Sequence, residues 1–158
     1  MRLEENEHTE EAMARLHLET ANTIVAEALQ KARTMDASPL AVAVLDETGQ
    51  LQSFQREDET SLMRADVAIG KAWGALGMGR SSRVLGSVAA ERPHFVQALT
   101  AVAQGKLVPV PGGVLIRDES RSIIGAVGIS GDTSDIDEEC AVAGIEAAGL
   151  TADTGVSA

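Results

Sequence analysis

Aromatic residues are almost absent from this chain of 158 residues. Only Phe54, Trp73 and Phe95 occur, which is 2% of the sequence, and there is no tyrosine. The core must therefore be filled by Ala, Val, Leu and Ile, whose small side chains let helices and strands pack closely. With 44% apolar and 23% charged residues the composition is still that of a globular protein. The length suits a single domain.

Basic residues and cysteine are also scarce, and long apolar runs are missing. The 13 Lys and Arg against 24 Asp and Glu give a net charge of -11, which repels nucleic acid and anionic membranes. No apolar run approaches the roughly 20 residues that span a bilayer. Cys140 alone cannot form an internal disulfide, and no export signal is visible. We therefore expect a cytoplasmic protein with neither nucleic-acid nor membrane partners.

Apolar residues at helical spacing predict several helices. The first runs from Glu19 to a break at 36–39, and its apolar face consists of Ala21, Ile24, Val25, Ala28, Leu29 and Ala32. A second helix begins at the cap Ser61, and a third covers residues 94–104. Residues 80–92 are less periodic. The last helix begins near Ser134 and carries an apolar stripe, namely Ile136, Cys140, Ala143 and Ala147.

Two pairs of short apolar segments predict β-hairpins. Residues 40–46 and 51–56 flank a turn that contains Gly49, and residues 114–117 and 123–130 flank a polar turn. Hairpin strands pair antiparallel. The expected fold class is therefore α/β of the α+β kind, an antiparallel sheet of two hairpins with helices packed on it.

The two ends of the chain lack this periodicity. Residues 1–15 are expected to form a mobile N-terminal arm, and residues 151–158 a frayed C-terminal tail. The folded domain is thus expected to cover residues 16–150.

Lys71 and a glycine pair are candidate site residues. Lys71 lies in an alanine-rich part of the second predicted helix, where it can pair with a ligand carboxylate or act as a base if burial lowers its pKa. The alternative is a surface lysine whose stem covers apolar neighbours. Gly112 and Gly113 follow Pro111 and let a ligand or a second subunit approach the backbone, unless they form only a turn.

Two further features have simpler explanations beside the functional ones. Residues 128–131 lead into the last helix, whose free N–H groups suit an anion, but the acidic residues of that turn also offset the helix dipole. His8, His17 and His94 show no metal-ligand spacing, so no metal site is expected. Cys140 is interpreted as a core thiol.

These elements together resemble the GlcG/HbpS family of haem-binding or haem-degrading domain-like proteins. The resemblance covers about Leu16 to Leu150 and rests on the segments LHLETANTIVAEALQKA, AVAVLDETGQLQSFQRED, ADVAIGKAWGA, PGGVLI, IIGAVGISG and DIDEECAVAGI. It implies a profilin-like sheet with helices on both sides and assembly into dimers or larger rings. The sequence departs from the family pattern at Leu115, where a proline is usual, and at Gly74, where a threonine is common.

The resemblance favours a small-molecule-binding protein with haem or another tetrapyrrole as the implied ligand. An imidazole ligand to the iron would then be His17 or His94. The alternative is an enzyme that acts on a small unsaturated organic acid. In that hypothesis Lys71 with Arg56 or Arg64 holds a carboxylate, and Asp137 or Glu138 moves protons.

Two spatial expectations follow. Lys71, Gly112 and Gly113 are expected to line one cleft, because the family's KA and GGV motifs imply convergence there. A homo-oligomer is also expected, because alanine-rich helix faces cover little apolar surface unless a second subunit completes them. The last helix would contribute its small residues to that contact, namely Ala141, Ala143, Gly144, Ala147 and Ala148.

Overall fold

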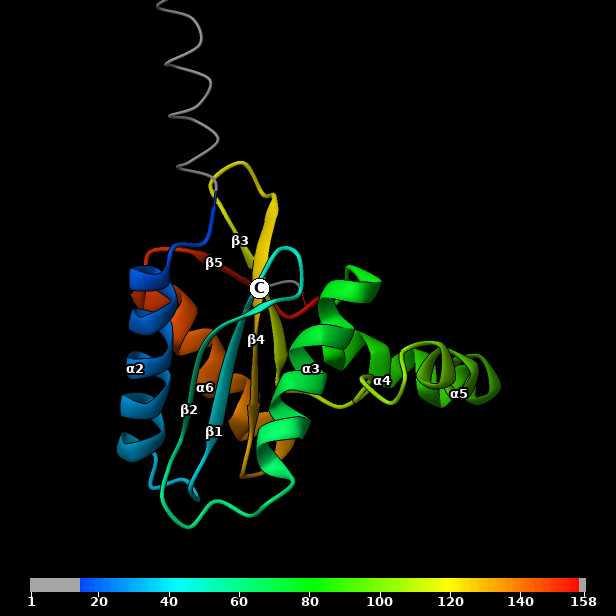
Figure 1. Ribbon diagram of the computed structural model, residues 1–158, viewed down its shortest axis with the longest axis horizontal. Coiled ribbons are helices and arrows are strands. Elements are labelled where there is room, and N and C mark those ends of the chain that lie inside the picture. Colours follow the sequence, from blue (N-terminus) through cyan, green and yellow to red (C-terminus); the bar gives the residue numbers. More distant parts are fainter. Residues whose placement is uncertain (1–14, 157–158) are drawn as a thin grey trace, which may run out of the picture.

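A computed structural model describes residues 15–156 of the chain (Figure 1). Five strands form one sheet in the order β2-β1-β4-β3-β5, and every neighbouring pair is antiparallel. Their bounds are β1 Ala41–Asp46, β2 Leu51–Arg56, β3 Gly113–Arg117, β4 Ile123–Ser130 and β5 Thr151–Asp153. Both predicted hairpins are present, joined side by side through β1 and β4, so the expected α+β antiparallel fold is confirmed.

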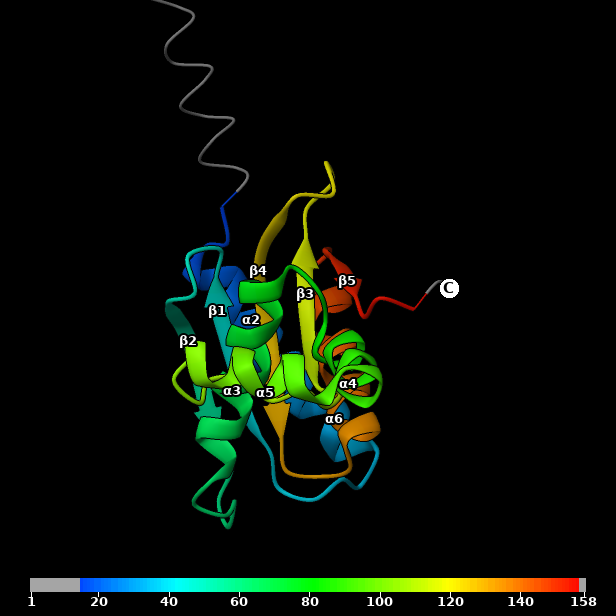
Figure 2. The same cartoon turned by 90° about the vertical axis from the view of Figure 1, so that its right-hand side faces the viewer.

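Helices cover both faces of the sheet (Figure 1). α2 (Leu18–Thr34) and α6 (Ser134–Ala147) pack together on one face, and α3 (Arg64–Met78) lies on the other. α4 (Ser82–Glu91) and α5 (Pro93–Val102) form a helical hairpin that projects beyond α3 (Figures 1 and 2). Within residues 15–156 no helix has both the length and the apolar character needed to cross a bilayer.

The alanine-rich stripe of α6 is largely used within the chain. Ala141 and Gly144 are buried against α2, and a Cβ at Gly144 would lie 2.5 Å from the carbonyl oxygen of Ile24. Small residues on both helices let the two backbones approach, as expected for a core with few aromatics. The expectation that this stripe faces a second subunit is therefore wrong for Ala141 and Gly144, because their surface is already covered by α2.

The C-terminal segment differs from the frayed tail that was expected from residue 151. Thr151–Asp153 form β5, which pairs with β3 through Leu115↔Asp153, Ile116↔Ala152 and Arg117↔Thr151. The Arg117 guanidinium also donates to the Asp153 carboxylate at 2.8 Å. A three-residue strand has too short an apolar pattern to be recognised in sequence. The predicted N-terminal arm, residues 1–15, lies outside the described residues except for Arg15.

Candidate functional site

Lys71 and Asp137 form a buried ion pair between the two helical layers. Lys71 lies on α3, Asp137 lies in the first turn of α6, and their side chains are 2% and 1% exposed. The Lys71 Nζ donates to Asp137 Oδ2 at 3.2 Å and to the carbonyl oxygen of Ile129 on β4 at 2.8 Å. Asp137 Oδ1 accepts from the backbone N–H of Asp132 at 3.0 Å. The pair thus connects α3, β4 and α6.

The two glycines at the start of β3 make room for this lysine. Gly112 has a φ of 123°, and a Cβ there would lie 2.8 Å from the Lys71 Nζ. A Cβ at Gly113 would lie 2.3 Å from the Lys71 carbonyl oxygen. The family motifs implied that Lys71, Gly112 and Gly113 converge, and the structure places them in contact. Burial excludes the surface-lysine alternative, while a role in binding a ligand stays a prediction.

Burial governs the protonation of the pair. Desolvation lowers the pKa of the Lys71 ammonium, and the opposite charge of Asp137 counteracts that shift. Desolvation likewise raises the pKa of the Asp137 carboxyl, and Lys71 counteracts it. Both shifts favour the neutral forms of the two groups. The pair can therefore exchange a proton internally, but its groups have almost no access to a molecule in solution.

Two arginines lie at the same end of the sheet as Lys71 and Asp137. The Arg64 guanidinium, half-buried at the start of α3, donates to the hydroxyl of Ser130 at 3.1 Å and lies close enough to affect the pKa of both Lys71 and Asp137. Arg56 ends β2, and the register aligns it with Ala41 of β1 and through Ala41 with Ser130 of β4. Of the two predicted carboxylate-binding arginines, Arg64 therefore contacts the buried Ser130, and Arg56 lies two strands away in the same row of the sheet.

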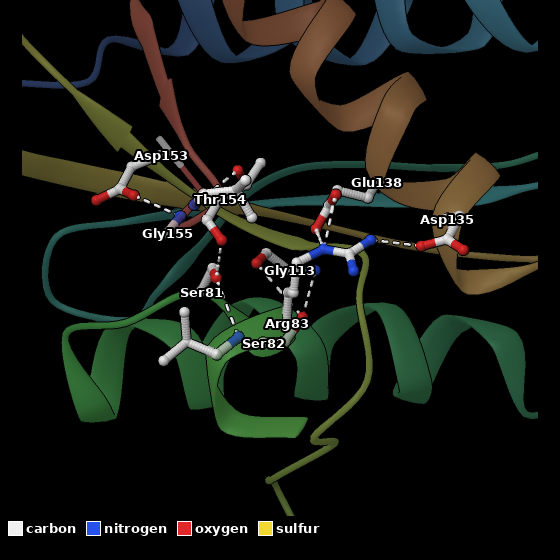
Figure 3. Close-up of polar contacts among 11 residues, drawn as sticks. Ser81, Ser82, Arg83, Gly113, Asp135, Glu138, Asp153, Thr154 and Gly155 are labelled. Atoms are coloured by element: carbon white, nitrogen blue, oxygen red, sulfur yellow. Dashed lines mark hydrogen bonds and ion pairs between the residues drawn. The ribbon is translucent and has the colours of Figure 1, made fainter. Parts of the chain in front are cut away.

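Glu138 pairs with a different residue from its neighbour Asp137. Both of its carboxylate oxygens accept from the Nε of Arg83, at 3.0 and 3.1 Å, and Arg83 also pairs with Asp135 (Figure 3). These bonds connect the start of α4 to α6. Glu138 therefore lies apart from the Lys71 amine, although both carboxylates were candidates for the same proton transfer.

Sequence reasoning missed the first turn of α4. The Ser82 hydroxyl is buried and accepts from the backbone N–H of Gly113 at 2.7 Å, while Ser81 caps the helix at the Val84 N–H (Figure 3). The hydroxyl of Ser81 also donates to the carbonyl oxygen of Thr154. A serine cap before an apolar pattern at Val84, Leu85 and Val88 was the available signal.

The N-terminus of α6 is capped by the chain itself. Thr133 accepts from the Ile136 N–H at 3.3 Å, and Asp132 accepts from the N–H groups of Ser38 and Thr133 at 2.7 Å each. Side-chain oxygens of the same turn therefore accept from the N–H groups of Asp132, Thr133 and Ile136. Among residues 15–156 no group of three His, Cys, Asp or Glu is placed to hold a metal ion.

Cys140 is a core residue, as expected. Its side chain is fully buried within the layer formed by α2 and α6. Burial raises the pKa of the thiol to about 11, so the reactive thiolate is scarce at neutral pH.

The two candidate haem ligands lie on opposite faces of the sheet. His17 is exposed at the N-cap of α2, and His94 is exposed in the first turn of α5 (Figure 1). The sheet and α3 separate the two helices, so the imidazoles of one chain cannot share an iron. The structure leaves each of them as a separate candidate.

Comparison with known proteins adds a family and several related folds. The family model described as "Haem degrading protein HbpS-like" matches residues 16–146. The structure named PduOC:Heme complex is 25% identical, covers 88% of this chain and 99% of its own, and superposes with a TM-score of 0.79. Klebsiella pneumoniae protein ORFY is 25% identical over 85% of this chain and 90% of its own, with a TM-score of 0.76.

A third solved structure is a double mutant of Streptomyces reticuli HbpS. It is 25% identical, covers 84% of this chain and 86% of its own, and has a TM-score of 0.71. The search of curated proteins gave no match.

Proposed function

The chain belongs to the HbpS-like family of haem-degrading proteins, whose model matches residues 16–146, and from this premise we propose that it binds haem or a related tetrapyrrole. The observation that carries the proposal is the likeness to PduOC in its haem complex, which extends over 99% of that chain.

The donor set of the chain fits a haem iron. A neutral imidazole is a common axial ligand, and both His17 and His94 are exposed on the surface of a helix start. Haem would supply the iron and its redox chemistry, and the chain would supply one imidazole and an apolar surface for the porphyrin.

Haemin titration of the purified protein tests the proposal. We expect a sharp, saturable shift of the Soret band in the visible spectrum, because coordination changes the electronic state of the iron. His17→Ala and His94→Ala identify the ligand: one of them should remove the shift, and the double variant must do so. His8→Ala, at a position outside the described residues, is the matched control and should bind as the wild type does.

Two results would contradict this picture in different ways. An unchanged shift in the double variant would move coordination to an oxygen ligand or to stacking without coordination. Absence of any saturable shift in the wild type would refute haem binding itself.

A second candidate function is supported by the two arginines at the end of the sheet near Ser130. Arg56 and Arg64 suit the carboxylate of a small organic acid, which fits an enzyme acting on a small unsaturated acid. Lys71 and Asp137 would reach such a substrate only after a movement that exposes them. A screen of small acids by thermal shift distinguishes this function, since Arg64→Gln should remove the stabilisation by any acid that binds beside Ser130, while haemin binding persists.

We also propose that the protein assembles as a homo-oligomer in the cytoplasm. The support is the apolar surface that the α4–α5 hairpin exposes, including Phe95 at 36% and Val102 at 82% exposure. A second copy of the chain is the proposed occupant of this surface, because the uncharged stretch 93–105 is one place where two chains of net charge -11 meet with little repulsion. The cytoplasmic location rests on the single, buried cysteine.

A further inference from the structure

A groove lies beside β5 on the α3 side of the sheet, at the opposite end from Arg64. Leu115 of β3 packs beneath α3, so Arg117, two residues later, points to the same side. Its register partner Thr151 and the next alternate residue, Asp153, share that side. β5 is the edge strand next to β3 (Figure 2) and packs chiefly against β3 and α6, which leaves its α3 side open.

The groove has the size of a small-molecule site. Its volume is about 520 Å³, and its lining consists of Arg117, Arg121 and residues 151–156. Volumes of roughly 300 to 1,000 Å³ are typical of ligand pockets. Neither His17 nor His94 lines it, so it is independent of the proposed haem ligands.

The charge of the groove is opposite to that of the whole chain. Arg117 donates to Asp153 at 2.8 Å and to the carbonyl oxygen of Arg121 at 2.7 Å. Within residues 15–156 no ion pair or hydrogen bond engages the Arg121 guanidinium. Two guanidinium groups against one carboxylate leave one net positive charge in the lining, whereas the chain carries -11. The acidic residues of the neighbouring turn, Asp118 and Glu119, do not line the groove.

Arg121 occupies a backbone position that suits glycine better. Its φ is 65°, in the left-handed region, where a side chain with a Cβ costs about 1 kcal/mol. The turn is held by Asp118, whose carbonyl and carboxylate oxygens accept from the N–H groups of Arg121 at 3.0 Å and Ser122 at 2.9 Å. Backbone strain of this kind is concentrated at functional sites. Here the strained turn places the free Arg121 guanidinium at the groove.

The opposite wall is fixed before any ligand arrives. The Asp153 carboxylate accepts from the Gly155 N–H at 2.8 Å, and Ser81 of α4 bonds the Thr154 carbonyl (Figure 3). Gly155 lies so close to α4 that a Cβ would come within 2.3 Å of Val84. Residues 154–156 are thus held against the N-terminus of α4, and preorganisation of this kind lowers the entropy lost on binding.

We propose that this groove binds a small organic acid through its carboxylate, with Arg121 as the main charge partner. The free guanidinium can donate two parallel hydrogen bonds to a carboxylate. The Thr151 hydroxyl faces the same side, and Val156, which is 64% exposed, offers an apolar wall for a short carbon chain. Inorganic phosphate can pair with the same guanidinium, but unlike succinate it has no carbon chain to place against Val156.

Titration of the full-length, ¹⁵N-labelled protein with succinate and, separately, with inorganic phosphate tests the proposal. We expect saturable amide shifts at Arg121, Thr151, Thr154 and Gly155, and a lower Kd for succinate than for phosphate. Arg121→Gln, which removes the charge of an exposed side chain but keeps it polar, should weaken succinate binding by about tenfold or more.

Arg80→Gln is the matched control. Arg80 is exposed at the end of α3 and does not line the groove, so its loss makes the same change in net charge at another place. Succinate affinity in this variant should stay within about twofold of the wild type. Equal weakening by both substitutions would show attraction to overall charge and overturn the proposal. So would phosphate binding as tightly as succinate, or no saturable shifts in the wild type.

Discussion

The two helical units on the α3 side of the sheet are held in contrasting ways. α3 lies so close to β4 that a Cβ at Gly128 would fall 1.8 Å from the Ala68 carbonyl oxygen, and the buried Lys71–Asp137 pair links it to α6. The α4–α5 hairpin instead packs on a small separate apolar cluster, formed by Leu85, Val96 and Leu107, of which Leu107 follows α5 and also lies against α3 at Gly74. Polar contacts of Ser81, Ser82 and Arg83 attach it to the rest of the domain.

This contrast indicates that α3 contributes mainly to the stability of the fold, whereas the α4–α5 hairpin contributes a surface for contacts. Close packing and buried charge around α3 tolerate little change, because neighbouring backbone atoms have nowhere to move. The hairpin exposes one of the three aromatic residues, Phe95, over which the Arg92 guanidinium lies 4.2 Å from the ring centroid. A unit that exposes apolar side chains in this way is suited to contacts with other molecules.

Removing the buried amine should have the largest effect. Lys71→Met keeps the length of the side chain but leaves Asp137 without its cation, which should lower the free energy of unfolding by about 3–5 kcal/mol at about pH 8. The pKa of Asp137 is already raised by burial, and loss of Lys71 raises it further. A carboxyl whose pKa is higher in the folded state binds a proton on folding, so the variant should lose stability as the pH rises through that value.

Urea unfolding at about pH 5 and pH 8 measures this difference. The matched control is Lys71→Met combined with Asp137→Asn, in which the amide oxygen can still accept from the Asp132 N–H. The stability gap between the single and the double variant should widen at the higher pH. A gap of the same size at both pH values would show that the pKa of Asp137 in the folded variant is not raised into this pH range.

Filling the contact between α3 and β4 should have the next largest effect. Gly128→Ala places a methyl group on the backbone of α3 and should destabilise the protein by about 1–3 kcal/mol or more. Gly77→Ala is the matched control on the exposed side of the same helix, where a Cβ would meet only the Trp73 ring at 3.7 Å. That substitution should stabilise the protein by about 0.5–1 kcal/mol. Denaturant midpoints in the opposite order would contradict the close packing.

The contrast also explains what could be predicted from the sequence. The hairpins β1–β2 and β3–β4 and the helices α2 and α3 have strong apolar periodicity with glycine or serine at their boundaries, so their positions followed from local rules. α4 was missed because its apolar residues form a small satellite cluster rather than a face on the main core. β5 depends on pairing with β3 and on Arg117–Asp153, which no local pattern reveals.

The residues of the candidate site could be predicted from the sequence, but the contacts between them could not. Lys71, Asp137 and the glycines of β3 were selected as residue types suited to a pocket, yet the lysine fills the space that the glycines leave. Whether Lys71 reaches Asp137 depends on the distance between α3 and α6, which lie on opposite faces of the sheet. Such a distance is set by tertiary packing and has no local sequence signal. Arg121 was not selected as a ligand-binding residue. Its suitability depends on a left-handed turn and on the lack of a partner carboxylate within the described residues, and neither can be seen in the sequence.

The smallest effect on stability is expected at the exposed end of the hairpin, where assembly is tested. Val102→Glu changes a side chain that is 82% exposed and should alter the free energy of unfolding by no more than about 0.5 kcal/mol. It nevertheless places a charge in the uncharged stretch 93–105, so it should lower the mass of the oligomer. Light scattering after size exclusion measures that mass, and Leu18→Glu, at another exposed helix position, is the control that should assemble like the wild type.

High salt screens the repulsion between chains of net charge -11 and should strengthen assembly. A wild-type mass of one chain at micromolar concentration, in both low and high salt, would exclude the oligomer, and equal loss of mass in both variants would exclude the hairpin as its contact.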